Sequence, residues 1–165
     1  MEYSNIPKTI GRKENNPTPH LRIIGLYVIK MKKITIIDGQ GGKIGRTIVE
    51  QLKKAHPEQE LYAIGTNAIA TSAMLKAGAD YVATGENPCI VNAKDSDIII
   101  GPIGIVIANA LLGEITPEIS VAVGASKAYK ILIPMNKCNH HVVGCGDKGL
   151  AENIRLVCEE IEELL

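Results

Sequence analysis

The sequence predicts an α/β protein, a Rossmann-like three-layer sandwich with a mostly parallel sheet of five or six strands. Short β-branched segments alternate with longer segments of helical periodicity, an order typical of parallel sheets with right-handed crossovers. Hydrophobic residues make up 45% of the 165 residues and aromatic residues only 3%. A core of branched aliphatic side chains and alanine suits strands that are buried on both faces.

Each predicted strand is a short apolar run that stops at glycine, proline or a polar turn. The first, KITIID, ends before Gly39, and the second ends before Gly65. Short β-branched runs bounded by such residues are typical of strands. The expected strands cover 33–38, 60–64, 81–84, 97–100 and 130–133, and a short sixth strand at 141–144 is left open.

The predicted helices place apolar residues three or four positions apart. In KIGRTIVEQLKKA, the residues Ile44, Ile48 and Leu52 share one face, while charged residues cover the other. This spacing favours an amphipathic helix. Helices are expected at 43–55, 67–77 and 150–164, with helical pieces at 105–112 and 117–124.

The first thirty residues are predicted to lie outside the domain. Residues 1–20 are polar, contain three prolines and show no periodicity, as unstructured segments do. The apolar stretch 23–29 is too short for a bilayer span, which takes about 20 residues. We therefore expect residues 1–30 to be a non-native extension before a start at Met31, a disordered or weakly docked arm, or a targeting segment. Residues 31–165 are expected to form a single Rossmann-like domain.

Charge and cysteine usage exclude several classes of partner. Residues 31–165 carry 13 basic and 16 acidic residues, whereas a nucleic-acid-binding surface needs a basic patch. The four cysteines contain no C-x-x-C pair, which indicates reduced thiols. We expect a cytoplasmic protein that binds neither nucleic acid nor membrane.

The loop after the first strand, DGQGGKIG from Asp38 to Gly45, is the most informative stretch. Free N–H groups and the positive end of a helix dipole face such a turn and favour an anion. Its spacing G-x-x-G-x-x-G resembles the loop of extended short-chain dehydrogenases and related NAD(P) binders. Two features differ, because Asp38 replaces a neutral residue and Thr66 with Asn67 replaces the acid that commonly holds a ribose. NAD(P) or another nucleotide stays open as the cofactor, as does a purely structural tight turn.

The loops after the other strands converge on the same edge of a doubly wound sheet, where ligands bind. They are rich in glycine, amide and hydroxyl residues, whereas the loops at the opposite edge are ordinary charged turns. This asymmetry predicts a ligand site at the C-terminal edge. The predicted ligand-binding residues are Gly39, Gln40, Gly41, Gly42, Lys43, Ile44, Gly45, Thr66, Asn67, Thr84, Gly85, Asn87, Gly101, Pro102, Ile103, Gly104 and Asn136.

Candidates for catalysis are Asp38 and Glu86, the acids at the predicted edge. Either could bind Mg²⁺ or act as a general base. The alternatives are a carboxylate that caps the loop for Asp38 and a solvated turn residue for Glu86. Cys138, His140 and Cys145 are the candidate metal ligands, although their spacing matches no established zinc module. No metal site is therefore predicted.

Several longer stretches of the sequence resemble those of one protein family, and together they cover most of the chain. In order, IIDGQGGKIG, AIGTNAIATSAMLKAGAD, ATGEN, IIIGPIGI, GEITPEIS and ILIPMNKCN resemble a small bacterial family catalogued as domain of unknown function 3842. The match spans about residues 31–145. It implies a compact Rossmann-like protein without an assigned activity, and it supplies no catalytic residues.

The preferred hypothesis is the binding of a nucleotide or another phosphorylated small molecule at the C-terminal edge of the sheet. One alternative is a small Mg-dependent or NAD(P)-dependent enzyme that uses Asp38 or Glu86. Another is a non-binding structural or oligomerisation subunit that associates through the apolar segment 98–112. Whether the chain catalyses a reaction, and whether it forms a homo-oligomer, stays open.

Overall fold

The computed structural model describes residues 21–24, 27–135, 141–146 and 148–165. Backbone contacts divide the chain into two units, Met1–Met31 and Lys32–Leu165. In the first unit, β1 (Leu21–Ile24) and β2 (Tyr27–Lys30) pair antiparallel. The prediction that residues 1–20 are unstructured falls outside the described residues.

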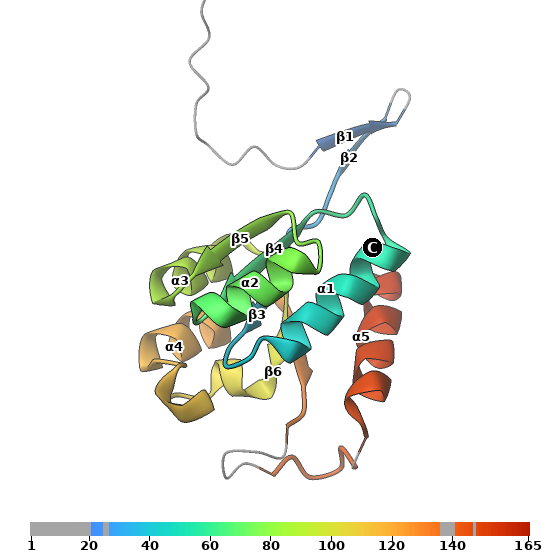
Figure 1. Ribbon diagram of the computed structural model, residues 1–165. Coiled ribbons are helices and arrows are strands. Elements are labelled where there is room, and N and C mark those ends of the chain that lie inside the picture. The colour runs from blue at the N-terminus through green and yellow to red at the C-terminus, as the bar shows by residue number, and fades with distance from the viewer. Residues whose placement is uncertain (1–20, 25–26, 136–140, 147) are drawn as a thin grey trace, which may run out of the picture. The chain divides into compact units, whose positions relative to one another are not determined.

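The second unit is built on an all-parallel sheet of five strands in the order β5-β4-β3-β6-β7. This arrangement confirms the predicted α/β fold. The strands are β3 (Ile34–Asp38), β4 (Leu61–Gly65), β5 (Tyr81–Thr84), β6 (Ile98–Pro102) and β7 (Tyr129–Ile133). The chain builds outward from β3 to β5, then crosses over and adds β6 and β7 on the other side (Figure 1). The strand order therefore reverses between β3 and β6, and a ligand crevice is expected beyond the carboxyl ends of these two strands.

Helices cover both faces of the sheet and make it the middle layer of three (Figure 1). One face carries α1 (Lys43–Ala55), α2 (Ala68–Lys76) and α5 (Leu150–Leu164). The other carries α3 (Glu86–Asp95), α4 (Pro117–Ala125) and the 3-10 turns η1 (Ile103–Val106) and η2 (Leu111–Gly113). Successive residues of β3 point to opposite faces of the sheet. Ile36 packs against the layer of α1, and Ile37 packs against the layer on the other face.

Two segments were left open or were not predicted from the sequence. Residues 141–144 form no strand, since residues 143–144 make a turn and Gly144 has a φ of 87°. Helix α3 occupies residues 86–95, for which no helix was expected. Pro88 is its third residue, where the missing N–H would have no intrahelical acceptor, so proline does not stop the helix there.

The segment after β6 also differs from the expected helix. Asn109, Leu111 and Leu112 have φ between 55° and 62°, a left-handed conformation that interrupts the helix expected at 105–112. The five residues of β6 itself are all buried. This part of the apolar segment considered for association therefore packs inside the sheet and offers no surface to a partner.

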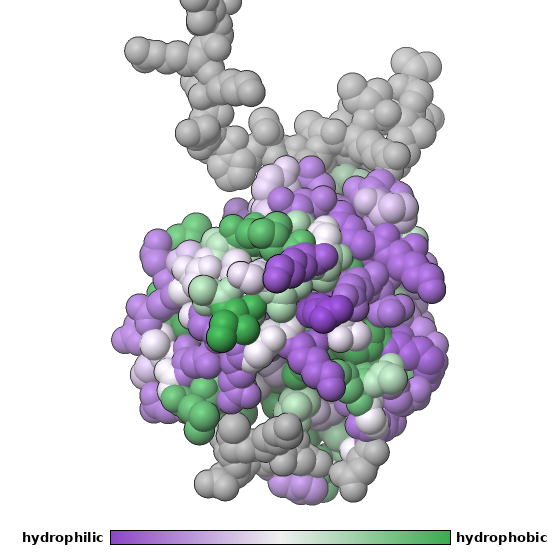
Figure 2. Space-filling model, in the orientation of Figure 1, coloured by the Kyte–Doolittle hydropathy of each residue, from purple (hydrophilic) through white to green (hydrophobic). Residues whose placement is uncertain are grey.

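The surface of the second unit is mixed. Figure 2 shows hydrophilic residues along α1, with separate apolar residues elsewhere on this face. On α2, Ile69 and Leu75 are exposed. Single exposed apolar residues are ordinary on proteins. Within the described ranges, no helix has both the length and the apolar character needed to span a bilayer.

Candidate functional site

A cavity of about 540 Å³ opens beyond the carboxyl ends of β3 and β6, at the point where the strand order reverses. Its volume lies in the range of small-molecule sites. Five separate parts of the chain contribute to it. The lining residues are Asp38–Ile44, Pro102–Gly104, Ile107, Ala110, Leu111, Pro134, Met135, Gly146, Lys148, Leu150 and Asn153.

Asp38 ends β3 and is buried beneath the glycine loop, with only 4% of its surface exposed. Its carboxylate accepts hydrogen bonds from the N–H groups of Gly39 at 2.8 Å and Gly45 at 2.7 Å. Burial raises the pKa of Asp38 above its usual value of 3.8, and the amide hydrogen bonds oppose that rise. The geometry is that of a carboxylate that caps the loop, which was the alternative to a catalytic or metal-binding role for Asp38.

The other amides of this loop divide into occupied and free groups. The N–H of Gln40 donates to the Glu114 carboxylate at 2.9 Å. The N–H groups of Gly41 and Lys43 meet no acceptor among the described residues. Helix α1 begins after Gly42, which has no side chain to cap it. Two amides at the positive end of the helix dipole are therefore available at the cavity.

A second helix begins at the same cavity. The first residue of α5, Leu150, lines the wall, and the residue before it is Gly149, again without a side-chain cap. In contrast, α2 and α4 are capped by the side chains of Asn67 and Thr116, neither of which lines the cavity. The cavity thus collects two helix N-termini whose N-cap residue is a glycine without a side-chain cap, although in α1 the Gly45 N–H donates to Asp38.

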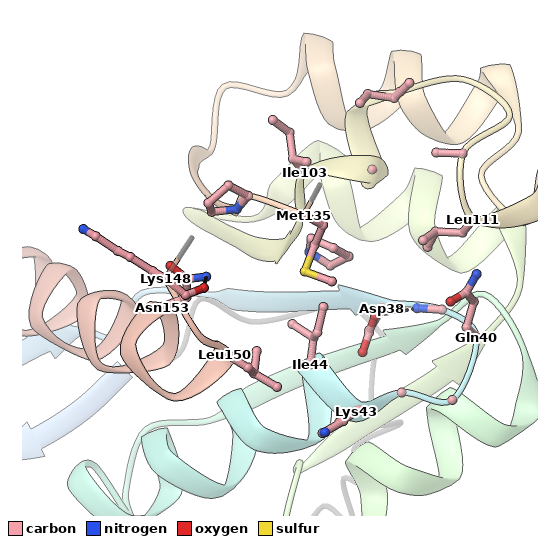
Figure 3. A pocket seen from close by; sticks show the side chains of 18 of the residues that line it. Asp38, Gln40, Lys43, Ile44, Ile103, Leu111, Met135, Lys148, Leu150 and Asn153 are labelled. Carbon is pink, nitrogen blue, oxygen red and sulfur yellow. Dashed lines mark hydrogen bonds between the residues drawn. The ribbon is translucent and has the colours of Figure 1, made fainter. Parts of the chain in front are cut away.

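The middle of the cavity is apolar and its ends are polar. Figure 3 shows Ile44 and Met135 pointing toward each other across the space, with Ile103 above them. Lys148 and Asn153 lie together at one end. Lys43 adds a second cation to the lining, and Asp38 is the lone carboxylate among the described lining residues.

The loop after β4 was predicted to contact a ligand, but a carboxylate from the chain itself closes it. Glu114 accepts hydrogen bonds from the Thr66 hydroxyl, from the Asn67 side chain at 2.9 Å and from the Gln40 N–H. Burial alone would raise the pKa of Glu114, but these three hydrogen bonds hold the pKa below its usual value of 4.5. Asn67 also caps α2 by accepting from the N–H of Ala70 at 2.9 Å. The polar groups of this loop are therefore committed to internal partners.

The cavity brings together only part of the predicted set. The predicted residues that line it are Gly39, Gln40, Gly41, Gly42, Lys43, Ile44, Pro102, Ile103 and Gly104. The predicted residues that do not line it are Gly45, Thr66, Asn67, Thr84, Gly85, Asn87 and Gly101. Gly101 lies within β6, where an added Cβ would lie 2.4 Å from the carbonyl oxygen of Ile37. A glycine is therefore needed there for the packing of the strands. Asn136 falls outside the described residues.

The other candidates for chemistry lie apart from the cavity or outside the described residues. Glu86 is the exposed first residue of α3 and does not line the cavity. Cys138 and His140 fall outside the described residues, and Cys145 is a free thiol. Within the part of the chain that the structure describes, no three His, Cys, Asp or Glu residues gather in a way that could hold a metal ion.

Sequence reasoning missed the far wall of the cavity, which comes from Ile107, Leu111, Met135, Lys148 and Asn153. One of these carried a visible signal. Asn153 stands three residues after Leu150 and four before Val157, so it interrupts the apolar stripe of α5 with an amide. A polar residue in a buried stripe is informative, whereas the apolar wall residues could not be told from ordinary core.

No curated protein matches the chain significantly. The FMN-dependent cysteine decarboxylase TvaF from thioviridamide biosynthesis aligns with a TM-score of 0.44 at 14% identity, over 78% of this chain and 86% of that chain. A dodecameric FMN-dependent UbiX-like decarboxylase from Escherichia coli O157:H7 aligns with a TM-score of 0.42 at 16% identity, over 80% and 77%. At these scores the likeness is confined to the general course of the backbone.

The sequence itself identifies a family. A family model described as domain of unknown function (DUF3842) matches residues 33–165, which include every strand and helix of the second unit. This match agrees with the resemblance carried by the glycine loop and the strings that follow it. The chain belongs to the DUF3842 family.

Proposed function

We propose that this protein binds a nucleotide or another phosphorylated small molecule in the cavity beyond β3 and β6. The observation that carries the proposal is the meeting of two helix N-termini without side-chain caps at one cavity. A phosphate near the free N–H groups of Gly41 and Lys43 would gain hydrogen bonds and a favourable interaction with the helix dipole. The charges of Lys43 and Lys148 act in the same direction.

The position of Asp38 is compatible with an anion in the cavity. Its oxygens accept hydrogen bonds from the amides of Gly39 and Gly45 beneath the loop, so its charge is partly compensated by the backbone. The repulsion between this carboxylate and a bound phosphate is therefore smaller than it would be for a carboxylate without such hydrogen bonds. The apolar walls formed by Ile44 and Met135 suit a ring or another apolar part of the ligand.

The geometry does not favour the alternative of a magnesium-dependent enzyme at Asp38 or Glu86. Both oxygens of the Asp38 carboxylate accept amide hydrogen bonds, and the side chain is buried. Glu86 lies on α3, away from the cavity lining. Association into a homo-oligomer remains a prediction.

The test is a thermal-shift and calorimetry panel with NAD(H), NADP(H), ATP, GTP, FMN, AMP and ribose 5-phosphate. A ligand at 100 times its dissociation constant should add about 2.7 kcal/mol to the free energy of unfolding. Lys43→Met should weaken binding about tenfold, the typical effect of losing one charge-assisted hydrogen bond. Lys54→Met is the matched control, because Lys54 is exposed at the other end of the same helix.

Two results would contradict the proposal. One is a panel in which no compound stabilises the protein. The other is an equal loss of affinity in Lys43→Met and Lys54→Met, which would mean that net charge rather than the cavity attracts the ligand.

A further inference from the structure

Asn153 is a buried polar side chain with unused hydrogen-bonding capacity. It lies in the first turns of α5 and is 8% exposed. Its Nδ2 donates one long hydrogen bond to the carbonyl of Lys148 at 3.4 Å, and its Oδ1 meets no donor among the described residues. The amide atoms of Asn153 are not among the fully buried side-chain atoms that lack a partner, so they reach the cavity and can bond a molecule there.

The position of Asn153 makes a purely structural explanation weak. Ile154, Val157 and Ile161 on the same helix are buried in the core, and a leucine at position 153 would continue that packing with no polar group among the apolar side chains. Asn153 instead lines the cavity, and Figure 3 shows it beside Lys148 at one end of the space that Ile44 and Met135 border. The amide therefore lies where the ring of a bound ligand would end.

The chemistry of this end of the cavity distinguishes two classes of phosphorylated ligand. A side-chain amide presents an N–H donor and a C=O acceptor side by side in one plane, which matches the adjacent acceptor and donor on the edge of a nitrogen heterocycle. The side chains of Ile44 and Met135 can pack against the two faces of such a ring. A sugar phosphate carries hydroxyl groups all around, and several of these would be buried against apolar walls without partners.

We infer that Asn153 recognises the heterocycle edge of the ligand, and that the ligand is a nucleotide rather than a sugar phosphate. This inference rests on the proposed function. The phosphate lies at the glycine loop and the N-terminus of α1, and the base or flavin-type ring lies between Ile44 and Met135 with its polar edge at Asn153.

The experiment compares AMP, GMP, UMP and FMN with ribose 5-phosphate by calorimetry on the full chain. At least one nucleotide should bind at least tenfold more tightly than ribose 5-phosphate. Asn153→Leu should weaken that nucleotide at least tenfold and leave ribose 5-phosphate within about twofold. Asn92→Leu is the matched control, because Asn92 is also a helical amide bonded to a backbone carbonyl, that of Pro88, but does not line the cavity.

A measurement without ligand supplies a second readout. If Asn153 serves recognition, Asn153→Leu should keep or raise the Tm of the free protein. The substitution replaces an amide that makes one long hydrogen bond with an apolar side chain in the apolar stripe of α5. A lower Tm would show that the amide is structural and would overturn the inference. Equal weakening of nucleotides and ribose 5-phosphate, or no weakening at all, would also overturn it.

The two proposals fail in different ways. If Lys43→Met weakens phosphate ligands while Asn153→Leu changes nothing, the proposed function stands and the inference about the ring is wrong. If no phosphorylated compound binds the wild-type protein, both are wrong.

Discussion

The loops that follow β3 and β4 lie at the same edge of the sheet, yet one is open to the cavity and the other is closed by side chains of the protein itself. The loop after β3 starts α1 at a glycine and leaves two N–H groups free at the cavity. The loop after β4 starts α2 at Asn67, whose side chain caps the helix, and Glu114 binds the remaining donors. A parallel sheet brings every such loop to one edge, but only a loop whose donors stay unpaired can receive an anion.

The glycine that begins α1 also has a packing role, which separates it from its neighbour in the loop. Gly42 has a φ of 68°, and an added Cβ would lie 2.6 Å from the Cα of Ala70 in α2. An added Cβ at Gly41 would meet nothing within 4 Å. The absence of a side chain at position 42 thus brings α1 and α2 together, in addition to leaving the helix uncapped.

The largest effect is expected for Gly42→Ala. A left-handed conformation costs an alanine about 1–2 kcal/mol, and the forced contact with the backbone of α2 adds about 1–3 kcal/mol. Urea denaturation should show a loss of about 3 kcal/mol in the free energy of unfolding. Gly41→Ala is the control and should change that free energy by less than about 0.5 kcal/mol. Similar losses in both variants would mean that the two helices do not depend on this close approach.

A smaller effect is expected when the closed loop is opened by Asn67→Ala. The variant loses the cap of α2 and the hydrogen bonds to Glu114 and to the carbonyl of Gln40. A lost cap costs about 1 kcal/mol, and the further bonds should bring the total to about 2 kcal/mol. Thr116→Ala removes the cap of α4 alone and should cost about 1 kcal/mol. Equal costs would show that Glu114 adds nothing to the closure of this loop.

Much of the fold could be predicted because its signals are local. Glycine and proline mark the ends of β3, β4 and β6, and the spacing of Ile44, Ile48 and Leu52 fixes the buried face of α1. The same local reasoning failed for α3, because the effect of a proline on a helix depends on whether it lies in the first turn or in the interior. No helix was expected at 86–95, yet Pro88 lies in the first turn of α3, where proline removes no hydrogen bond and does not stop the helix.

The site was harder to predict because its decisive contacts join distant parts of the chain. The glycine loop was found from its own residues, but Glu114 reaches Gln40 across 74 positions of sequence. No local pattern shows that this carboxylate takes the donors of Thr66 and Asn67, which were therefore assigned to a ligand. The amide of Asn153 was visible in the apolar stripe of α5, but its place at the cavity depends on how that helix packs on the sheet.

The smallest expected effect is on the pH dependence of stability. It has opposite signs for Asp38, which binds the loop after β3, and Glu114, which binds the loop after β4. Asp38 has its pKa raised above 3.8 by burial, so the folded state binds its proton more tightly than the unfolded chain does. The stability that Asp38 contributes is fully present below pH 3.8 and is lost as the pH rises through the raised value. Glu114 has its pKa held below 4.5, so its contribution is present above pH 4.5 and is lost as the pH falls through the lowered value.

The measurement is the free energy of unfolding in urea from about pH 3 to pH 7 for the wild type, Asp38→Asn and Glu114→Gln. The cost of Asp38→Asn should fall as the pH rises, whereas the cost of Glu114→Gln should rise. A common direction for both costs would show that one of the two environments is wrongly assigned. An anion bound at the open loop should raise the pKa of Asp38 further, since it adds a negative charge near a buried acid. Repeating the titration with a ligand therefore tests whether the open loop, rather than the closed one, receives the phosphate.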